Sequence, residues 1–271
     1  KAVEIQQETG KTFIHPYDDE DVIAGQGTIG LEILEEMADV DAVVVPIGGG
    51  GLISGVAFAV KALNPNVKVY GVQAAGAPSM ERAVHEHQQL TLESVSTFAD
   101  GIAVKHPGDI TFQMCQQYVD EIVTVSDDEI ATAILALIEQ QKMVAEGAGA
   151  VAVAACMFHK LPVEGKKVVC VVSGGNIDVT ILSRVISRGL LMEGRLVDLT
   201  LALDDKPGEL THVSDIIAST GANIVLVRHS RGDINMDINS CFLTLQMETR
   251  NKAHADEVRE ALRAAGYQIV K

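Results

Sequence analysis

Four consecutive glycines, Gly48-Gly49-Gly50-Gly51, are the residues whose type and spacing most clearly suggest chemistry. They follow the β-branched run at residues 42–47 and precede helical spacing of apolar residues over 52–63. Glycines let the backbone approach a ligand closely, and a helix N-terminus adds partial positive charge. This glycine loop therefore predicts a phosphate site built from backbone N–H groups, with a plain glycine turn as the alternative. Because no Gly-Lys-Ser/Thr follows, a nucleoside-triphosphate P-loop is excluded.

Ser173-Gly174-Gly175-Asn176 forms a second strand-to-helix corner, between a strand-like run at 167–172 and a helical segment from Ile177. Parallel strands bring their carboxyl ends to one edge of a sheet, so we expect both corners to share a ligand. Ser173 would then direct a neutral hydroxyl into the site. Taken alone, the same residues are typical of an N-cap followed by a glycine turn.

Two further motifs are weaker. Residues 25–30 match the GxGxxG pattern, but no apolar strand precedes them and no acidic residue follows the next strand, which disfavours dinucleotide binding. We expect a tight loop there, leading into a helix that begins at Thr28. His15 has no second histidine at ligand spacing, so we expect it in a surface turn and predict no metal site in the chain.

Two acidic segments are open to two interpretations. Glu146 precedes a helix of small residues expected over 149–159, where its carboxylate could lie at the helix start or face the site. The segment 204–210 precedes a helix expected over 208–220. Its Gly208 and the helix N-terminus could hold an amino-acid carboxylate, or the segment could be a simple turn.

The elements that must position these motifs alternate between strand and helix over residues 1–190. This alternation predicts an α/β domain with a parallel sheet and helices on both faces. The expected strands span 42–47, 67–72, 121–125 and 167–172, and the expected helices span 28–38, 52–63, 79–87, 127–141, 149–159 and 177–188.

From residue 196 the order changes to βαββαβ, the ferredoxin-like arrangement. We expect a domain boundary near 190–196 and a second domain over 196–271. Its strands are expected over 197–203, 223–229, 238–247 and 267–270, its helices over 208–220 and 253–265, and its hairpin turn at Gly232-Asp233.

Composition limits the function classes. The 271 residues carry 21 Lys+Arg against 37 Asp+Glu, a net charge of −16 that argues against a nucleic-acid partner. No apolar run reaches the about 18–20 residues needed to span a bilayer, and no signal peptide precedes the first strand, so we expect no membrane partner. The four cysteines form no CxxC pair, and we expect buried free thiols in a reducing, cytoplasmic compartment.

Together these motifs resemble the pyridoxal-phosphate (PLP) threonine dehydratase, or threonine ammonia-lyase, family of fold type II enzymes, which is related to the serine racemases. The resemblance covers residues 1–190 and rests on a set of short matching segments. These are His15, residues 24–32, residues 46–52, Ala99-Asp100-Gly101, Glu146 and Ser173-Gly174-Gly175-Asn176. Residues 196–271 resemble an ACT domain, a regulatory module that binds amino acids.

The resemblance implies roles for individual residues. The glycine loop would hold the PLP phosphate, Ser173 would bond to the pyridine nitrogen, and Glu146 would lie near the cofactor. Tyr17 takes the place of an asparagine that contacts the cofactor in a relative. The metal ligands of the racemase correspond to neutral residues here, so tight binding of a divalent metal is not expected there. Those positions are Gln73, Ala77 and Ser79.

The family's Schiff-base lysine motif and its loop for the substrate carboxylate are not found in this sequence. The resemblance implies that both precede Lys1, that the chain is the C-terminal part of a longer enzyme, and that alone it is inactive. The implied reaction is deamination of L-threonine, and of L-serine, to 2-oxobutyrate or pyruvate and ammonia, in isoleucine biosynthesis or threonine catabolism.

The resemblance also implies allosteric regulation in a homo-oligomer, a dimer or a tetramer. A small amino acid would bind at a subunit interface formed by Gly208, Glu209, Leu210, Asn223 and Ile224. The alternatives are a serine racemase, a serine dehydratase or a non-catalytic amino-acid sensor.

Overall fold

The computed structural model describes residues 1–231 and 238–270, so the expected hairpin turn at Gly232-Asp233 lies outside the described residues. The chain forms two compact units, Lys1–Leu182 and Ser183–Lys271. The helix α8, Val179–Met192, contains the division between them.

The first unit is built on a four-stranded parallel sheet in the order β3-β2-β1-β4. Its central strand β1 is buried at every residue, as a parallel strand covered on both faces must be. The strands are β1 (Ala42–Pro46), β2 (Lys68–Ala74), β3 (Glu121–Val125) and β4 (Val168–Cys170). The prediction of a parallel sheet flanked by helices is confirmed.

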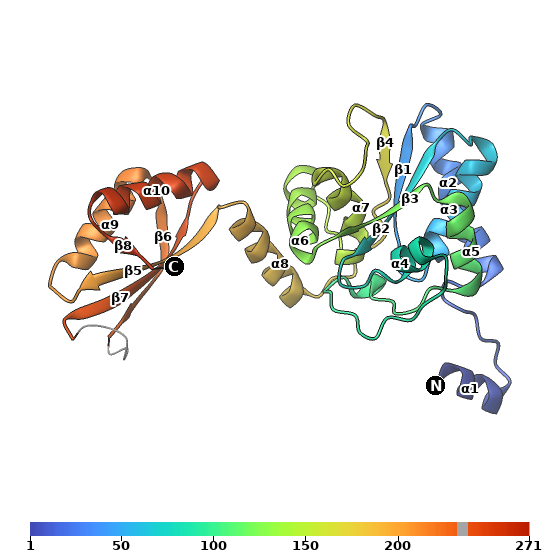
Figure 1. Ribbon diagram of the computed structural model, residues 1–271, viewed down its shortest axis with the longest axis horizontal. Coiled ribbons are helices and arrows are strands. Elements are labelled where there is room, and N and C mark those ends of the chain that lie inside the picture. The colour runs from blue at the N-terminus through green and yellow to red at the C-terminus, as the bar shows by residue number, and fades with distance from the viewer. Residues whose placement is uncertain (232–237, 271) are drawn as a thin grey trace. The chain divides into compact units, whose positions relative to one another are not determined.

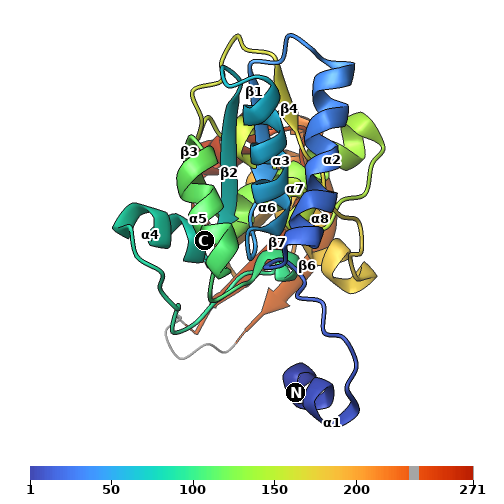
Figure 2. The same ribbon diagram turned by 90° about the vertical axis from the view of Figure 1, so that its right-hand side faces the viewer.

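Helices cover both faces of this sheet (Figures 1 and 2). One face carries α2 (Glu20–Glu36), α3 (Gly51–Leu63) and α5 (Asp109–Tyr118), and the other carries α6 (Asp127–Ala136) and α7 (Gly147–Met157). The remaining helical elements are α1 (Ala2–Thr9), α4 (Ser79–Glu86), η1 (Asp100–Ile102) and η2 (Leu137–Gln141). The core between the sheet and α3 is aliphatic, with Val43, Val45, Ile53 and Val56 fully buried.

The loop predicted at residues 25–30 is wrong, because these residues lie inside α2. The helix begins at Glu20, since the side chain of Asp19 accepts hydrogen bonds from the N–H groups of Asp21 (3.0 Å) and Val22 (3.1 Å). The glycines serve helix packing instead. A Cβ at Gly30 would lie 2.9 Å from the carbonyl oxygen of Val56, so glycine lets α2 pack closely against α3.

The second unit is an antiparallel four-stranded sheet in the order β6-β7-β5-β8, with the βαββαβ connection that the sequence predicts. Buried residues alternate along β5 and β7, as in a sheet with one face on a core. The core includes Leu201, Ile217, Leu245 and Leu262. The elements are β5 (Leu196–Asp204), α9 (Glu209–Thr220), β6 (Asn223–Ser230), β7 (Ser240–Glu248), α10 (Lys252–Ala264) and β8 (Gln268–Ile269).

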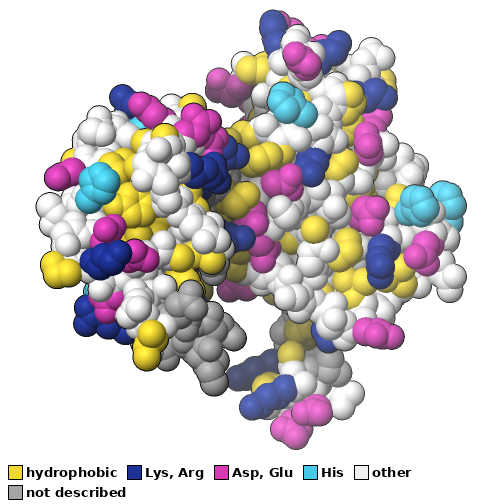
Figure 3. Space-filling model, turned by 60° about the vertical axis from the view of Figure 1, so that its left-hand side comes forward, with side chains coloured by type: hydrophobic (Ala, Val, Ile, Leu, Met, Phe, Trp, Pro, Cys, Tyr) yellow, Lys and Arg dark blue, Asp and Glu magenta, His cyan; other side chains and the backbone are white. Residues whose placement is uncertain are grey.

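The surface carries charges of both signs. Acidic and basic side chains are interspersed on the face drawn in Figure 3. Within the described parts of the chain, no helix is both long and apolar enough to cross a bilayer.

Candidate functional site

The glycine loop turns the chain from β1 into α3. Gly50 is the N-cap residue of α3, and its φ of 103° lies in the left-handed region that favours glycine. The loop is held through its carbonyl groups: that of Gly49 accepts from Thr111 Oγ1 (2.6 Å) and that of Gly50 from the Ser54 N–H (3.0 Å). Among the described residues, no acceptor pairs with the four N–H groups of the loop. These donors at a helix N-terminus are therefore available to an anion.

The helix α5 supports the loop from the side. The carboxylate of Asp18 accepts hydrogen bonds from the N–H groups of Asp109 (2.9 Å), Ile110 (2.9 Å) and Thr111 (3.2 Å), and so caps this helix. Thr111 in turn holds Gly49. Sequence reasoning missed Asp18 and Thr111, because the capping contacts join residues at least 91 positions apart. His15, by contrast, lies in a local turn, where its Nδ1 accepts from the Asp18 N–H at 2.9 Å.

A cavity of about 260 Å³ opens over the glycine loop. Ser173 lines the same cavity, as do Tyr17, Gly101 and Glu146. The structure therefore brings the two glycine corners together. Ser173 is exposed, so its hydroxyl can reach a ligand in the cavity.

Tyr17 lies against the glycine loop. A Cβ at Gly49 would overlap the Tyr17 ring, so only glycine permits this contact. The Tyr17 hydroxyl donates to the carbonyl oxygen of His106 at 3.3 Å. Burial, followed by the charge of Asp18, raises the pKa of Tyr17 above its ordinary value.

Glu146 is the N-cap residue of α7, but its side chain makes no capping hydrogen bond. Its N–H group donates to the carbonyl oxygen of Gly174 at 3.0 Å, and its side chain lines the cavity. A Cβ at Gly174 would overlap the Glu146 carboxylate, which shows how closely that carboxylate approaches the Ser173 corner. Of the two interpretations of Glu146, the structure favours the one that faces the site.

The positions that correspond to the racemase metal ligands carry neutral groups. Gln73 is buried, donates to the carbonyl oxygen of Ile47 (3.4 Å) and accepts from the Glu81 N–H (2.8 Å). Ala77 and Ser79 are also buried, and the Ser79 hydroxyl finds no partner among the described residues. No carboxylate stands at any of these three positions to attract a divalent cation.

In the second unit, Gly208, Glu209 and Leu210 line a cavity of about 430 Å³. Gly208 is the N-cap residue of α9 with a φ of 96°. Asn223 and Ile224 lie elsewhere in the same sheet. Asn223 pairs with Glu248, and Glu248 pairs with Leu196, the first residue of β5. Gly208 instead follows the last residue of β5, so it lies at the opposite end of that strand. Within one chain, the structure does not bring the two groups together.

All four cysteines are free. Cys115 and Cys241 are buried, as predicted, and burial raises the pKa of the Cys115 thiol to about 12. Burial, followed by the charge of Asp205, also raises the pKa of Cys241. Cys156 and Cys170 are only partly buried, and their sulfur atoms lie 3.5 Å apart.

Comparison with known proteins identifies the family. Residues 1–174, more than half of the chain, match the family described as pyridoxal-phosphate dependent enzyme. The chain belongs to this family. Its parallel sheet with flanking helices agrees with fold type II of the PLP-dependent enzymes.

Among the relatives, an L-threonine ammonia-lyase from Thermotoga maritima is 50% identical over 268 residues, which cover 99% of this chain and 67% of that protein. Two solved structures are also similar. The processed form of threonine deaminase isoform 2 from Solanum lycopersicum has a TM-score of 0.66 at 41% identity, covering 70% of this chain and 53% of that one. Maize serine racemase has a TM-score of 0.63 at 36% identity, and the match covers 70% of this chain and 59% of that one. The chain thus spans about two thirds of the curated relative.

The glycine loop fits the phosphate of PLP. Its N–H groups have no acceptor among the described residues, and its backbone leaves no room for larger side chains. At Gly50, a Cβ would lie 2.7 Å from Met80 Cε and from Thr111 Cβ. A bare backbone at a helix N-terminus is the arrangement that binds phosphate without a lysine.

Proposed function

We propose that the protein to which this chain belongs is a PLP-dependent threonine ammonia-lyase. It would convert L-threonine to 2-oxobutyrate and ammonia, and L-serine to pyruvate and ammonia. The observation that carries the proposal is the cavity lined jointly by the glycine loop and Ser173. The 50% identity to an L-threonine ammonia-lyase supports the choice of substrate.

The chain's own residues would bind and orient the cofactor. The N–H groups of the glycine loop would hold its phosphate, and Ser173 would form a hydrogen bond with its ring nitrogen. When bound, PLP supplies an electron sink for the charge that develops at the substrate Cα. Because a serine hydroxyl, unlike a carboxyl group, does not place a proton on that nitrogen, Ser173 favours prompt loss of the β-hydroxyl. Tyr17 and Glu146 would border the ring.

A lysine that attaches to the cofactor is required for this chemistry. No lysine is among the described residues that line the cavity. We therefore propose that the chain as printed does not deaminate threonine by itself.

We also propose that the second unit is an ACT domain that binds a small amino acid, a branched-chain one, as an allosteric effector. Gly208 and Asn223 lie toward opposite ends of the β5–β7 ladder, so one ligand can touch both only if two copies of the chain meet. The proposal thus includes a homo-oligomer, a dimer or a tetramer. Calorimetry with isoleucine, valine and threonine should show binding with at least one of them, and no heat with any would contradict it.

The direct test uses protein expressed from the complete reading frame that encodes this chain. With PLP and L-threonine it should release 2-oxobutyrate, whereas the chain as printed should not. Ser173→Ala should lower kcat roughly tenfold, since a hydrogen bond made to the ring is lost. Normal turnover by Ser173→Ala, or catalytic turnover by the chain as printed, would contradict the corresponding assignment.

The similarity to maize serine racemase favours one second candidate. Relative turnover of L-threonine, L-serine and D-serine separates the two: a racemase interconverts the serine enantiomers, whereas the proposed lyase produces oxo acids from the L-substrates. A complete protein without either activity, and without the visible absorbance of lysine-bound PLP, would instead be an amino-acid sensor.

A further inference from the structure

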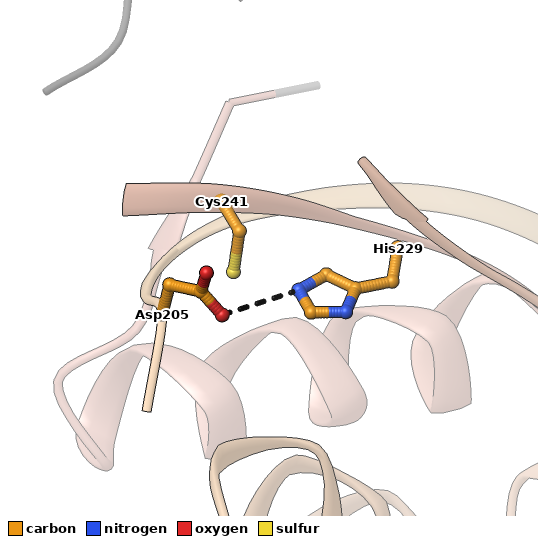
Figure 4. Close-up of side chains that lie close together, drawn as sticks. All are labelled: Asp205, His229 and Cys241. Atoms are coloured by element: carbon orange, nitrogen blue, oxygen red, sulfur yellow. Dashed lines mark ion pairs between the residues drawn. The ribbon is translucent and has the colours of Figure 1, made fainter. Parts of the chain in front are cut away.

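Three side chains that can bind metal meet at one end of the second unit's sheet. Asp205 directly follows β5, His229 lies near the end of β6, and Cys241 lies near the start of β7. One donor atom of each lies within 4.8 Å of the other two. Asp205 Oδ1 and His229 Nε2 are 4.0 Å apart, and Figure 4 shows the three side chains pointing toward one another. We call these residues the Asp–His–Cys cluster.

The strand register explains this convergence. His229 pairs with Leu243, two residues beyond Cys241, and paired residues of an antiparallel sheet share a face. His229 and Cys241 therefore project from the same face. Asp205 is fixed beside them, because its N–H donates to the carbonyl oxygen of Asn239 at 2.7 Å. Backbone hydrogen bonds thus hold all three positions before any ligand binds.

We propose that the Asp–His–Cys cluster binds a divalent transition-metal ion of the zinc class. Thiolate sulfur, imidazole nitrogen and carboxylate oxygen are the donors that Zn²⁺ takes in proteins. On binding, the Cys241 thiol releases its proton to solvent and its sulfur bonds to the metal. Three protein ligands leave a fourth tetrahedral position for water or a small ligand in the cavity of about 430 Å³ that the cluster lines.

The three donor atoms are close enough to bind one metal ion after small side-chain rotations. Donor atoms of a tetrahedral zinc site lie about 3.3–3.6 Å apart, whereas the donor atoms here lie within 4.8 Å of one another, so the separations must shrink by about 1.5 Å at most. The side chains of Asp205 and His229 are 28% and 41% exposed. They can therefore rotate toward the buried Cys241 without disturbing the core.

Arg231 is the competing cation. Its Nε lies 2.7 Å from Asp205 Oδ2, and its Nη2 donates to Oδ1 at 2.8 Å. The Arg231 side chain is 65% exposed, and exposed ion pairs contribute little free energy. A metal ion can displace this guanidinium into solvent. Removing it should accordingly strengthen metal binding.

This inference departs from the sequence expectation of no metal site and is independent of the proposed threonine chemistry. The three ligands lie at or next to the ends of three different strands, so they show no ligand spacing along the chain. A failed metal test would leave the cofactor proposal untouched, and a failed lyase assay would leave this one untouched.

The test is a titration of the full chain with Co²⁺, a spectroscopic substitute for Zn²⁺. It uses a Cys156→Ser, Cys170→Ser background, because those two adjacent thiols could bind metal themselves. We expect one Co²⁺ per chain, a thiolate-to-cobalt absorption band, and displacement by Zn²⁺. Cys241→Ser should abolish the band, and His229→Gln should weaken binding roughly tenfold or more. Arg231→Gln should tighten it.

His212→Gln is the matched control, since His212 lies in the same unit outside the cluster, and it should leave the affinity unchanged. His229 is exposed, so His229→Gln keeps the test valid even if Cys241→Ser fails to fold. Absence of a thiolate band in the background protein would overturn the proposal. So would a band that persists in Cys241→Ser, or an affinity that His229→Gln leaves unchanged.

Discussion

The corner between β1 and α3 and the corner between β5 and α9 share a backbone plan but present different groups. Each places a left-handed glycine at the helix N-cap, Gly50 with φ 103° and Gly208 with φ 96°. The first corner follows a strand buried at every residue and offers only backbone N–H groups. The second follows a half-exposed strand and carries charged side chains, including Asp205 and Glu209.

The difference shows that burial limits which chemical groups can form a binding site. A charged side chain costs free energy where water is excluded, so the buried corner uses backbone dipoles and helix charge to attract an anion. The exposed corner can keep charged side chains, and its specificity then depends on which side chains the sheet register brings together. Each prediction below removes one buried or supporting contact and compares it with a matched change at a more exposed or local position.

The largest effect is expected from Gly50→Ala. Its Cβ would meet Met80 and Thr111 at 2.7 Å, in addition to the strain of a positive φ. We expect the first unit to lose about 3 kcal/mol of unfolding free energy and to stop binding the cofactor phosphate. Amide hydrogen exchange of β1 peptides measures the stability, since it reports each unit separately.

Gly208→Ala is the control for crowding. Nothing lies within 4 Å of a Cβ at Gly208, so only backbone strain remains, and we expect a loss of about 1 kcal/mol in β5 peptides. Equal losses for the two variants would show that crowding at the buried corner is not important.

Asp18→Ala should have the next largest effect. Asp18 caps α5 through three N–H groups, and α5 holds Gly49 through Thr111. We expect about 1–2 kcal/mol of destabilisation together with weaker cofactor binding. Titration with pyridoxine 5′-phosphate, whose alcohol cannot condense with surface lysines, measures the binding.

Asp19→Ala is the neighbouring control. Asp19 caps α2 locally, so its loss should cost about 1 kcal/mol but leave cofactor affinity unchanged. If both variants weaken binding equally, the support of the loop by α5 is not specific.

A smaller effect is expected from Asp120→Asn. Burial acts to raise the pKa of Asp120, but hydrogen bonds from Lys61 (2.6 Å) and Lys68 (2.7 Å) outweigh it and hold that pKa below its usual value. A carboxyl with a lowered folded pKa stabilises above its unfolded pKa of about 3.9, and this contribution is lost as pH falls through the folded pKa. Asp120→Asn should lower the unfolding free energy of the first unit by roughly 1 kcal/mol at pH 7. Amide hydrogen exchange of β2 peptides should then change less as the pH falls into the acid range.

Asp256→Asn gives the smallest effect. Asp256 pairs with Arg259 at 2.8 Å but is 67% exposed, so we expect less than about 0.5 kcal/mol in α10 peptides. If Asp256→Asn lowered the unfolding free energy as much as Asp120→Asn does, the claim that burial strengthens an ion pair here would be contradicted.

Much of the architecture could be predicted from sequence because it depends on neighbours along the chain. The β-branched runs predicted the four parallel strands. The glycine loop was visible because four glycines are adjacent. The predicted start of α2 was wrong, because the GxGxxG spacing masked the cap at Asp19.

What the sequence did not reveal depends on distant contacts. Asp18 reaches α5 across at least 91 positions, and the Asp–His–Cys cluster joins three strands. Neither the Asp18 cap nor the Asp–His–Cys cluster has a pattern of neighbouring residues in the sequence, because helix packing creates the first and strand register creates the second. The shared cavity of the two glycine corners was predicted only through the general rule that parallel strands end at one edge.

The central claim is that the N–H groups of the glycine loop bind the cofactor phosphate. Selective ¹⁵N-glycine labelling of the chain, titrated with pyridoxine 5′-phosphate, tests this most directly. The signals of Gly48, Gly49, Gly50 and Gly51 should shift while those of Gly208 and Gly221 stay in place, and pyridoxine without phosphate should shift none of them. Unmoved loop signals, or equal shifts with and without the phosphate, would contradict the account.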